Sequence, residues 1–151
     1  MGSGSAIPTQ VINNDQLGQR VETNDAWIKS RTGIRERRVI GETETLIDLA
    51  TNAALNAVKM ANWDVKTIDL IILATSTPDD LFGSAPKIQS NLGASNAVAF
   101  DLTAACSGFL FALITASQFL TSGSMKRAIV IGADQLSCLL YTSPSPRDGL
   151  L

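Results

Sequence analysis

The sequence predicts an α/β protein built around a mostly parallel sheet. Three apolar segments are typical of buried strands, namely residues 68–74, 98–102 and 128–133, and the first is a run typical of a strand buried on both faces. Helical spacing of apolar residues marks three other segments, namely residues 42–60, 84–92 and 107–122. Because hydrophobic strands alternate with helices, the pattern indicates βαβ units.

The composition is typical of a globular protein and excludes several functional classes. Of the 151 residues, 45% are hydrophobic and 17% are charged, and no apolar run approaches the roughly eighteen residues of a membrane span. The net charge of −2 argues against a general nucleic-acid binder. Signal-peptide features are absent at the start, and Cys106 and Cys138 lack metal-ligand spacing. We therefore expect a cytoplasmic protein that binds no metal, membrane or nucleic acid.

Capping residues predict the ends of the first helices. Asn13 or Asn14 can cap a short helix, and residues 23–25 can cap a second one that ends near Gly33. For the helix at residues 42–60, Thr43 is the expected N-cap.

Cys106 lies where the strand at residues 98–102 gives way to the helix at 107–122. Free N–H groups and the macrodipole at a helix N-terminus favour a thiolate over a thiol, so Cys106 is a candidate nucleophile. The alternative is a buried structural cysteine, which packs as a small hydrophobe. The helix, which Gly123 ends, has almost no polar face, and we expect it to be buried on nearly all sides.

The chain contains no histidine. A cysteine-dependent acyltransferase usually needs an acid–base partner, and histidine is the commonest one. Either Cys106 is not catalytic, or its partner lies outside these residues.

Residues 23–38, TNDAWIKSRTGIRERR, combine an aromatic ring with arginines. The flat face of Trp27 suits a nucleobase, and the guanidinium of Arg31 suits phosphate oxygens. Arg31 and three further arginines make a basic patch that could steer an acidic protein, the three being Arg35, Arg37 and Arg38. The alternative is a solvated arginine turn with Trp27 as a core residue.

Several of these motifs together resemble one known family. DLTAACSGF at residues 101–109, followed by the apolar helix and by AIVIGAD at 128–134, resembles the active-site segment of the β-ketoacyl-acyl-carrier-protein synthase III family, in the thiolase-like superfamily. TNDAWIKSRTGIRERR is similar to a second motif of that family. The resemblance, over residues 1–137, implies the first of two tandem halves of a layered αβαβα architecture, truncated and with an incomplete first strand.

The resemblance also implies a reaction. Cys106 would take an acetyl group from acetyl-coenzyme A and pass it to malonyl-acyl carrier protein, which starts fatty-acid synthesis. Coenzyme A thioester would be a substrate, and no cofactor would be bound permanently. Thr23, Trp27 and Arg31 would hold the coenzyme A. The assisting His and Asn of the family belong to its second half, so the chain alone is expected to be inactive.

Two more residues match positions of the family that line its substrate site. Phe82 would reach over the active site of a partner subunit, which implies a homodimer of the full-length protein. Leu136 would lie in the acyl pocket. A lone loop phenylalanine is otherwise more often a local packing residue.

The last residues break the pattern. Residues 138–148, CLLYTSPSPRD, resemble the translation of a transposase adapter used in sequencing libraries, so we interpret residues 138–151 as a non-native tail. Two alternatives to the synthase remain. One is another acyltransferase of the superfamily, of the polyketide or 3-hydroxy-3-methylglutaryl-coenzyme A synthase type. The other is a non-catalytic half-domain that only binds or dimerises.

Overall fold

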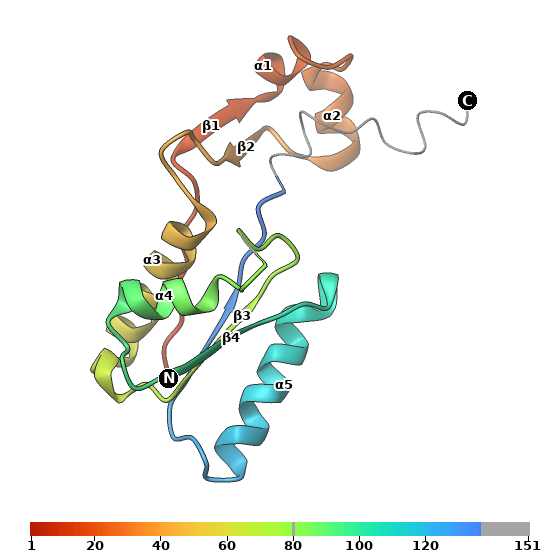
Figure 1. Cartoon of the computed structure of the whole chain (residues 1–151). Helices are drawn as coiled ribbons and strands as arrows, with labels where there is room; N and C mark the ends of the chain where they lie inside the picture. The colour runs from red at the N-terminus through yellow and green to blue at the C-terminus, as the bar shows by residue number, and fades with distance from the viewer. Residues whose placement is uncertain (80, 137–151) are drawn as a thin grey trace. The chain divides into compact units, whose positions relative to one another are not determined.

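The computed structural model describes residues 1–79 and 81–136, and the predicted non-native tail lies outside them. The chain divides into two compact units. One, the small unit, consists of Ile7–Glu44. The other, the sheet unit, consists of Met1–Ala6 and the residues from Thr45 onward (Figure 1).

The small unit is a two-stranded antiparallel ribbon with two helices in its connection. Its elements are β1 (Gln10–Asn13), α1 (Asn14–Gly18), α2 (Asp25–Thr32) and β2 (Glu36–Val39), with Gln10 opposite Val39. The side chain of Asn13 caps α1 and that of Asn24 caps α2, while Gly33 ends α2 in the left-handed conformation. The caps and helices confirm the expectation from the sequence, whereas the two short strands, which carry charged and polar residues, were not predicted.

The sheet unit alternates helices with strands. Its main elements are α3 (Leu46–Ala61), β3 (Leu70–Ala74), α4 (Ala85–Leu92), β4 (Val98–Leu102), α5 (Gly108–Thr121) and β5 (Ala128–Gly132). The strand order is β4-β3-β5, and both pairings are parallel. Short 3₁₀ turns lie at Val65–Thr67 and Ala105–Ser107. The parallel sheet and its βαβ connections confirm the predicted fold class.

Helices cover both faces of this sheet, as Figure 1 shows for α4 and α5. On one face, α3 and α4 bury Ile71 and Leu73 of β3. On the other face, α5 covers Leu70 and Ile72 of the same strand. Every residue of β3 is therefore buried, which explains its continuous apolar sequence.

The start of α3 differs from the prediction. Its N-cap is Thr45 rather than Thr43, because Thr45 forms a reciprocal capping box with Asp48. The Thr45 hydroxyl accepts from the Asp48 N–H at 3.1 Å, and the Asp48 carboxylate accepts from the Thr45 N–H at 3.2 Å. Both threonines are preceded by glutamate, so only the carboxylate three residues later distinguishes them.

The expected burial of α5 and β4 was wrong for this chain. Six large apolar residues of α5 are exposed by 40% or more, namely Phe109, Leu110, Phe111, Leu113, Ile114 and Leu120. The helix packs on the sheet through its small residues, Gly108, Ala112 and Ala116, which are its buried ones. Strand β4 is an edge strand, and no residue of it is fully buried. An apolar sequence therefore predicted more covering layers than the described residues provide.

Candidate active site

The carboxyl ends of the three parallel strands meet at one edge of the sheet. There the segments that follow β3 and β5 are joined by hydrogen bonds. The carboxylate of Asp134 accepts from the Ser76 N–H at 2.6 Å and from the Thr75 hydroxyl at 3.3 Å. The N–H of Gln135 donates to the Thr77 hydroxyl at 2.8 Å. Sequence reasoning did not single out these residues, although an acid directly after a buried strand is a signal that could have found Asp134.

Cys106 lies at this edge, in the 3₁₀ turn between β4 and α5, and is exposed. The residue before it, Ala105, has a φ of 45°, a left-handed backbone conformation that costs energy for a residue with a Cβ. Such strain persists only where the surrounding structure imposes it, and it is common at functional sites. The structure thus presents the thiol of Cys106 at the start of α5. The alternative interpretation, a buried structural cysteine, was wrong.

The N-terminus of α5 approaches the sheet closely beside Cys106. A Cβ added at Gly108 would lie 3.5 Å from the Cβ of Ala74, the last residue of β3. Ser107 makes no side-chain cap to the first turn of α5. The N–H groups of this turn are therefore not satisfied by that hydroxyl, and they favour negative charge at this position.

Phe82 and Leu136 belong to the same edge. Phe82 lies in the loop between β3 and α4 and is 93% exposed, as the sequence predicted, and Leu136 follows β5 and is 56% exposed. The topology thus gives one of the predicted residues to the segment after each strand: Phe82 after β3, Cys106 after β4 and Leu136 after β5.

Asp101 of β4 holds the loop that carries Phe82. Sequence reasoning did not identify this role of Asp101. Its two carboxylate oxygens accept from the N–H groups of Ser84 at 2.8 Å and Ala85 at 2.7 Å, at the start of α4. The Ser84 hydroxyl accepts in turn from the Asp79 N–H at 3.1 Å, which closes the loop. The strand that leads to Cys106 therefore also anchors the Phe82 loop.

Thr23, Trp27 and Arg31 come together in the small unit. The ring of Trp27 is 53% exposed, and the guanidinium carbon of Arg31 lies 4.9 Å from its centre, a cation–π contact. Thr23 and Trp27 line a pocket of about 350 Å³ together with Glu22 and Asn24. The hydroxyl oxygen of Thr23 is buried and has no hydrogen-bond partner among the described residues. A ligand that donates or accepts here would satisfy it. The exposure of Trp27 also shows that the alternative prediction, in which Trp27 is a core residue, was wrong.

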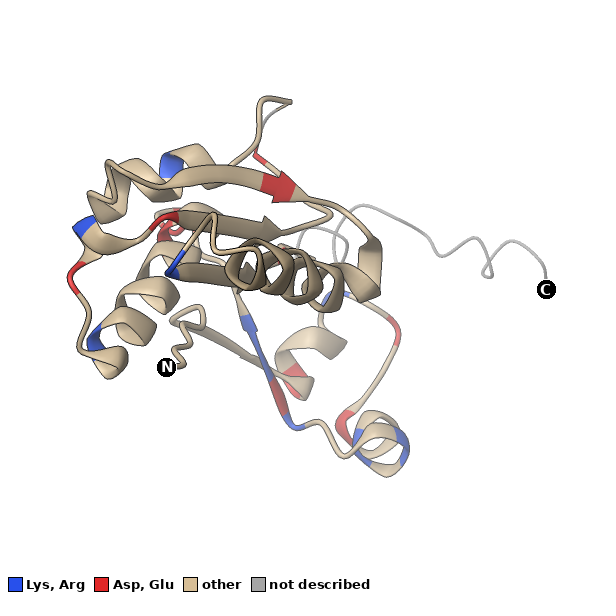
Figure 2. Ribbon diagram, turned by 90° about the horizontal axis from the view of Figure 1, so that it is seen from below, with Lys and Arg blue, Asp and Glu red and all other residues tan. Residues whose placement is uncertain are grey.

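The predicted basic patch is only partly available to a partner. Residues 35–38 read Arg-Glu-Arg-Arg, and Figure 2 shows a strand that is mostly blue with one red interruption. Arg37, however, donates to the carbonyl of Ile12 and, at 2.6 Å, to the Asn14 side chain. Arg38 donates to the carbonyls of Pro8 and Thr9. These two arginines tie β2 to the segment that precedes and includes β1.

Two further properties concern the described residues only. No helix among them is both long and apolar enough to cross a bilayer. They also contain no group of three His, Cys, Asp or Glu side chains arranged to hold a metal ion.

Comparison with known proteins identifies relatives of the whole described region. The family model of 3-oxoacyl-[acyl-carrier-protein (ACP)] synthase III matches residues 100–144, which include Cys106. A β-ketoacyl-[acyl-carrier-protein] synthase III of Prochlorococcus marinus strain NATL2A is 83% identical over 137 residues, which are 91% of this chain and 40% of the relative. The corresponding protein of strain MIT 9313 is 72% identical over 137 residues, with the same coverage. The chain thus spans about 40% of the length of the curated relatives it matches.

Solved structures give the same result for the fold. The 3-oxoacyl-[acyl-carrier-protein] synthase III of Aquifex aeolicus VF5 superposes with a TM-score of 0.85 at 47% identity, over 90% of this chain and 44% of that one. The priming β-ketosynthase of the R1128 polyketide pathway gives a TM-score of 0.86 at 33% identity, over 90% of this chain and 41% of that one. The chain thus matches part of the β-ketoacyl-[acyl-carrier-protein] synthase III proteins over 91% of its own length and has part of their thiolase-like fold.

Proposed function

We propose that this chain is part of a condensing enzyme that joins an acetyl group to malonyl-acyl carrier protein and so starts fatty-acid synthesis. The observation that carries the proposal is the position of Cys106: exposed, beside the strained Ala105, and at the N-terminus of α5. The matches to named synthases over most of this chain support the same assignment.

The first half of the reaction is a thioester exchange at Cys106. Its thiolate attacks the carbonyl carbon of acetyl-coenzyme A, and the electron pair of the broken C–S bond leaves with the coenzyme A thiolate. The N–H of Cys106 itself is suited to the oxyanion that forms on the carbonyl oxygen. In the second half, malonyl-acyl carrier protein loses carbon dioxide, its carbanion attacks the acetyl carbon, and the Cys106 thiolate is released.

We assign the coenzyme A nucleotide to the pocket of the small unit. The exposed face of Trp27 suits the adenine, and Arg31, which the ring contact holds in place, suits a phosphate. The unpaired hydroxyl of Thr23 is suited to a polar atom of the base. Coenzyme A acts here as a substrate rather than as a resident cofactor.

The remaining assignments concern the acyl group and the assembly. Phe82 and Leu136, at the edge of the sheet that bears Cys106, are suited to line the acyl pocket. The protruding Phe82 also suits contact with a second copy of the full-length protein, and we propose a homodimer. The reducing cytoplasm fits a free Cys106 thiol as nucleophile.

Peptide mass mapping tests the role of Cys106. The sample is a chimera in which the 137 aligned residues of this chain replace their counterparts in the strain NATL2A protein. After incubation with acetyl-coenzyme A, the acetyl group should reside on Cys106, and Cys106→Ala should abolish both the adduct and condensation. Ser107→Ala is the matched control and should keep the adduct. An adduct that persists elsewhere in Cys106→Ala contradicts the proposal, and coenzyme A binding without any adduct favours a binding module.

A priming ketosynthase of polyketide synthesis is a second candidate, which the superposition on the R1128 enzyme favours. The same chimera distinguishes the two functions. Condensation with malonyl groups carried by a fatty-acid carrier protein supports the first, whereas activity only with a polyketide carrier protein supports the second.

A titration of coenzyme A tests the nucleotide pocket. Trp27→Ala should weaken binding of coenzyme A by roughly 1–3 kcal/mol, by analogy with base–aromatic stacking, and should leave an acyl-pantetheine mimic unaffected. Thr23→Val removes the unpaired hydroxyl and should also weaken coenzyme A. Thr51→Val, in α3, removes the other buried hydroxyl without a partner and should leave coenzyme A binding unchanged. Equal losses for both ligands would indicate a structural role for Trp27.

A further inference from the structure

Asn14 is the most deeply buried polar side chain of the small unit, with only 1% of its surface exposed. Asn13 and Asn14 were both candidates for the N-cap of α1, and the cap is Asn13. The side chain of Asn14 has no part in that cap, and the proposed reaction does not use it. Because a buried amide is costly unless its donors and acceptor are paired, its partners explain why it is buried.

The amide nitrogen of Asn14 joins the two ends of α2. Its Nδ2 donates at 2.8 Å to a carboxylate oxygen of Asp25, the first residue of the helix. The same Nδ2 donates at 2.8 Å to the carbonyl of Ile34, which directly follows the C-cap Gly33. Both hydrogens of the amide are therefore used. One side chain thus holds α2 at its start and just beyond its end.

The amide oxygen of Asn14 joins the same helix to the two-stranded ribbon. Arg37 of β2 donates to Oδ1 of Asn14 at 2.6 Å and to the carbonyl of Ile12 in β1 at 3.2 Å. The position needs two donors and one acceptor on a short side chain. Asparagine supplies them, whereas aspartate has no donor when ionised and an apolar side chain has neither group. The ribbon is therefore the support to which Asn14 fixes α2.

Helix α2 has little else to fix its position. It has eight residues, and isolated helices shorter than about twelve residues are marginal in water. Ile28 is its one buried residue. Trp27 and Arg31 are four residues apart, so they lie on the same face of α2, where the guanidinium carbon is 4.9 Å from the ring centre. A shift of the helix would move both groups together.

We propose that Asn14 is a positioning residue for the nucleotide end of coenzyme A. Its burial keeps it from touching the ligand, and it acts by holding α2 so that Trp27 and Arg31 face the nucleotide together. The inference rests on the proposed nucleotide pocket. A misplacement of about 1 Å can cost as much as about 100-fold in such a site. Because Cys106 belongs to the sheet unit, loss of Asn14 weakens the binding of coenzyme A thioesters without slowing the chemical step.

Asn14→Asp tests the inference in the chimera with the strain NATL2A protein. The change keeps the oxygen that accepts from Arg37, but it removes the donor and sets a second carboxylate against that of Asp25. The KM for acetyl-coenzyme A should rise at least about tenfold while kcat stays within about twofold. Acetyl-pantetheine, which lacks the nucleotide, should keep its kinetics. Adding Asp25→Asn returns a donor to this contact and should lower the raised KM at least about threefold.

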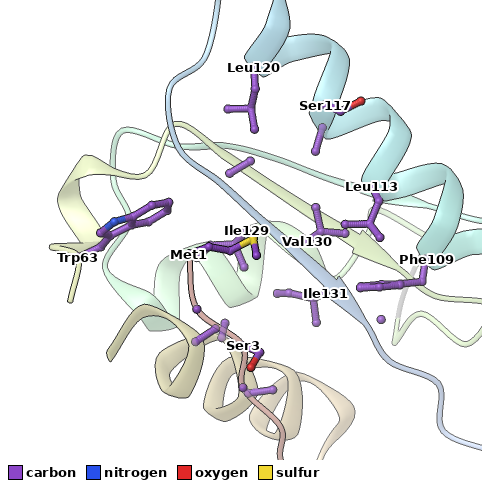
Figure 3. Close-up of a pocket in the computed structure, with 18 of the residues that line it drawn as sticks. Met1, Ser3, Trp63, Phe109, Leu113, Ser117, Leu120, Ile129, Val130 and Ile131 are labelled. Atoms are coloured by element: carbon purple, nitrogen blue, oxygen red, sulfur yellow. The ribbon is translucent and has the colours of Figure 1, made fainter. Parts of the chain in front are cut away.

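Two control variants separate positioning from charge and from stability. Asn13→Asp adds the same charge at the neighbouring, exposed residue and keeps the cap of α1, since aspartate caps a helix as well as asparagine does. Ile129→Val removes one methylene group from the core of the sheet unit, where Figure 3 shows Ile129 among the side chains that line an apolar pocket. The second control should lower the melting temperature, and both should leave the KM for acetyl-coenzyme A unchanged.

A double-mutant background gives the sharpest readout. In Trp27→Ala with Arg31→Ala, the groups that Asn14 positions are absent, so Asn14→Asp should have little further effect on KM. Full additivity, or an equal rise of KM for both thioesters, overturns the positioning role.

The positioning role and the nucleotide pocket can fail separately. If Trp27→Ala raises the KM for acetyl-coenzyme A and Asn14→Asp does not, the positioning role alone is refuted. If Trp27→Ala has no effect either, the nucleotide pocket itself is refuted. Should Asn14→Asp not fold, Asp25→Ala cuts the same contact from its half-buried partner and should raise the KM at least about threefold, and an unchanged KM refutes the role.

Discussion

Replacement of Asp101 is expected to loosen the Phe82 loop and destabilise the sheet unit. Its carboxylate accepts two short hydrogen bonds from the N–H groups of Ser84 and Ala85, which start α4. Both of these residues are fully buried, so water cannot replace the carboxylate. In Asp101→Ala, each N–H group left unsatisfied costs about 1–3 kcal/mol, which gives a combined loss of about 2–6 kcal/mol.

Urea unfolding measures this loss. With a slope of about 1.5–2 kcal/mol per molar urea, Asp101→Ala should lower the midpoint by at least about 1 M. Asp101→Asn should lose at least roughly half of the stability that Asp101→Ala loses. Its amide oxygen can accept from one N–H group, but its NH₂ group faces the other N–H group and cannot accept from it. Asp79→Ala, in the same loop, removes the same charge from an exposed position and should change stability by less than about 0.5 kcal/mol.

The result that would refute the reasoning is an equal midpoint for Asp101→Ala and Asp79→Ala. Amide exchange gives a second, local readout. The N–H groups of Ser84 and Ala85 should exchange faster in Asp101→Ala, while those of β3 should change only by the global loss of stability. Uniform acceleration throughout the unit would mean that Asp101 supports the whole core rather than the loop.

Two further predictions concern electrostatics and helix capping. The backbone N–H groups of Lys126 and Arg127 hold the pKa of Asp69 below its ordinary value of 3.8, so its contribution to stability is present above about pH 4 and is lost as the pH falls through the lowered pKa. The urea midpoints of the unaltered chain and Asp69→Asn should therefore differ above pH 5 and converge in acid, and a gap that persists at low pH would contradict this. Thr45→Ala removes the N-cap of α3 and should cost about 1 kcal/mol in thermal melting, whereas Thr45→Ser should keep most of it. Equal losses for both variants would exclude the hydroxyl as the cap.

The core of the fold could be predicted because the apolar pattern reports burial directly. The buried residues of β3 form one uninterrupted run, and Gly33, Gly93 and Gly123 mark three helix ends. Strands β1 and β2 could not be found in this way. They are four residues long, mostly exposed and rich in charged and polar side chains, and their pairing joins segments more than twenty residues apart.

The candidate site could be predicted where one residue carries the chemistry. Cys106 was singled out because the N-terminus of a helix favours a thiolate, and Trp27 and Arg31 were singled out because one stretch holds both. The contacts that position these groups were not found. The carboxylate of Asp101 meets α4 across 16 residues of sequence, and that of Asp134 meets Ser76 across 58. Neither separation follows from a local pattern, since both arise from the strand order.

The small residues on the inner side of α5 set the distance between the sheet and Cys106, the proposed nucleophile. Three small residues recur every four positions along the face of α5 that contacts the sheet, namely Gly108, Ala112 and Ala116. Their small side chains let the helix backbone lie close to the sheet. A larger side chain at Ala112 would lift the helix and carry its first turn, with Cys106, away from Ala74. The distance between the thiol and the edge of the sheet is thus encoded partly in residues that have no chemistry of their own.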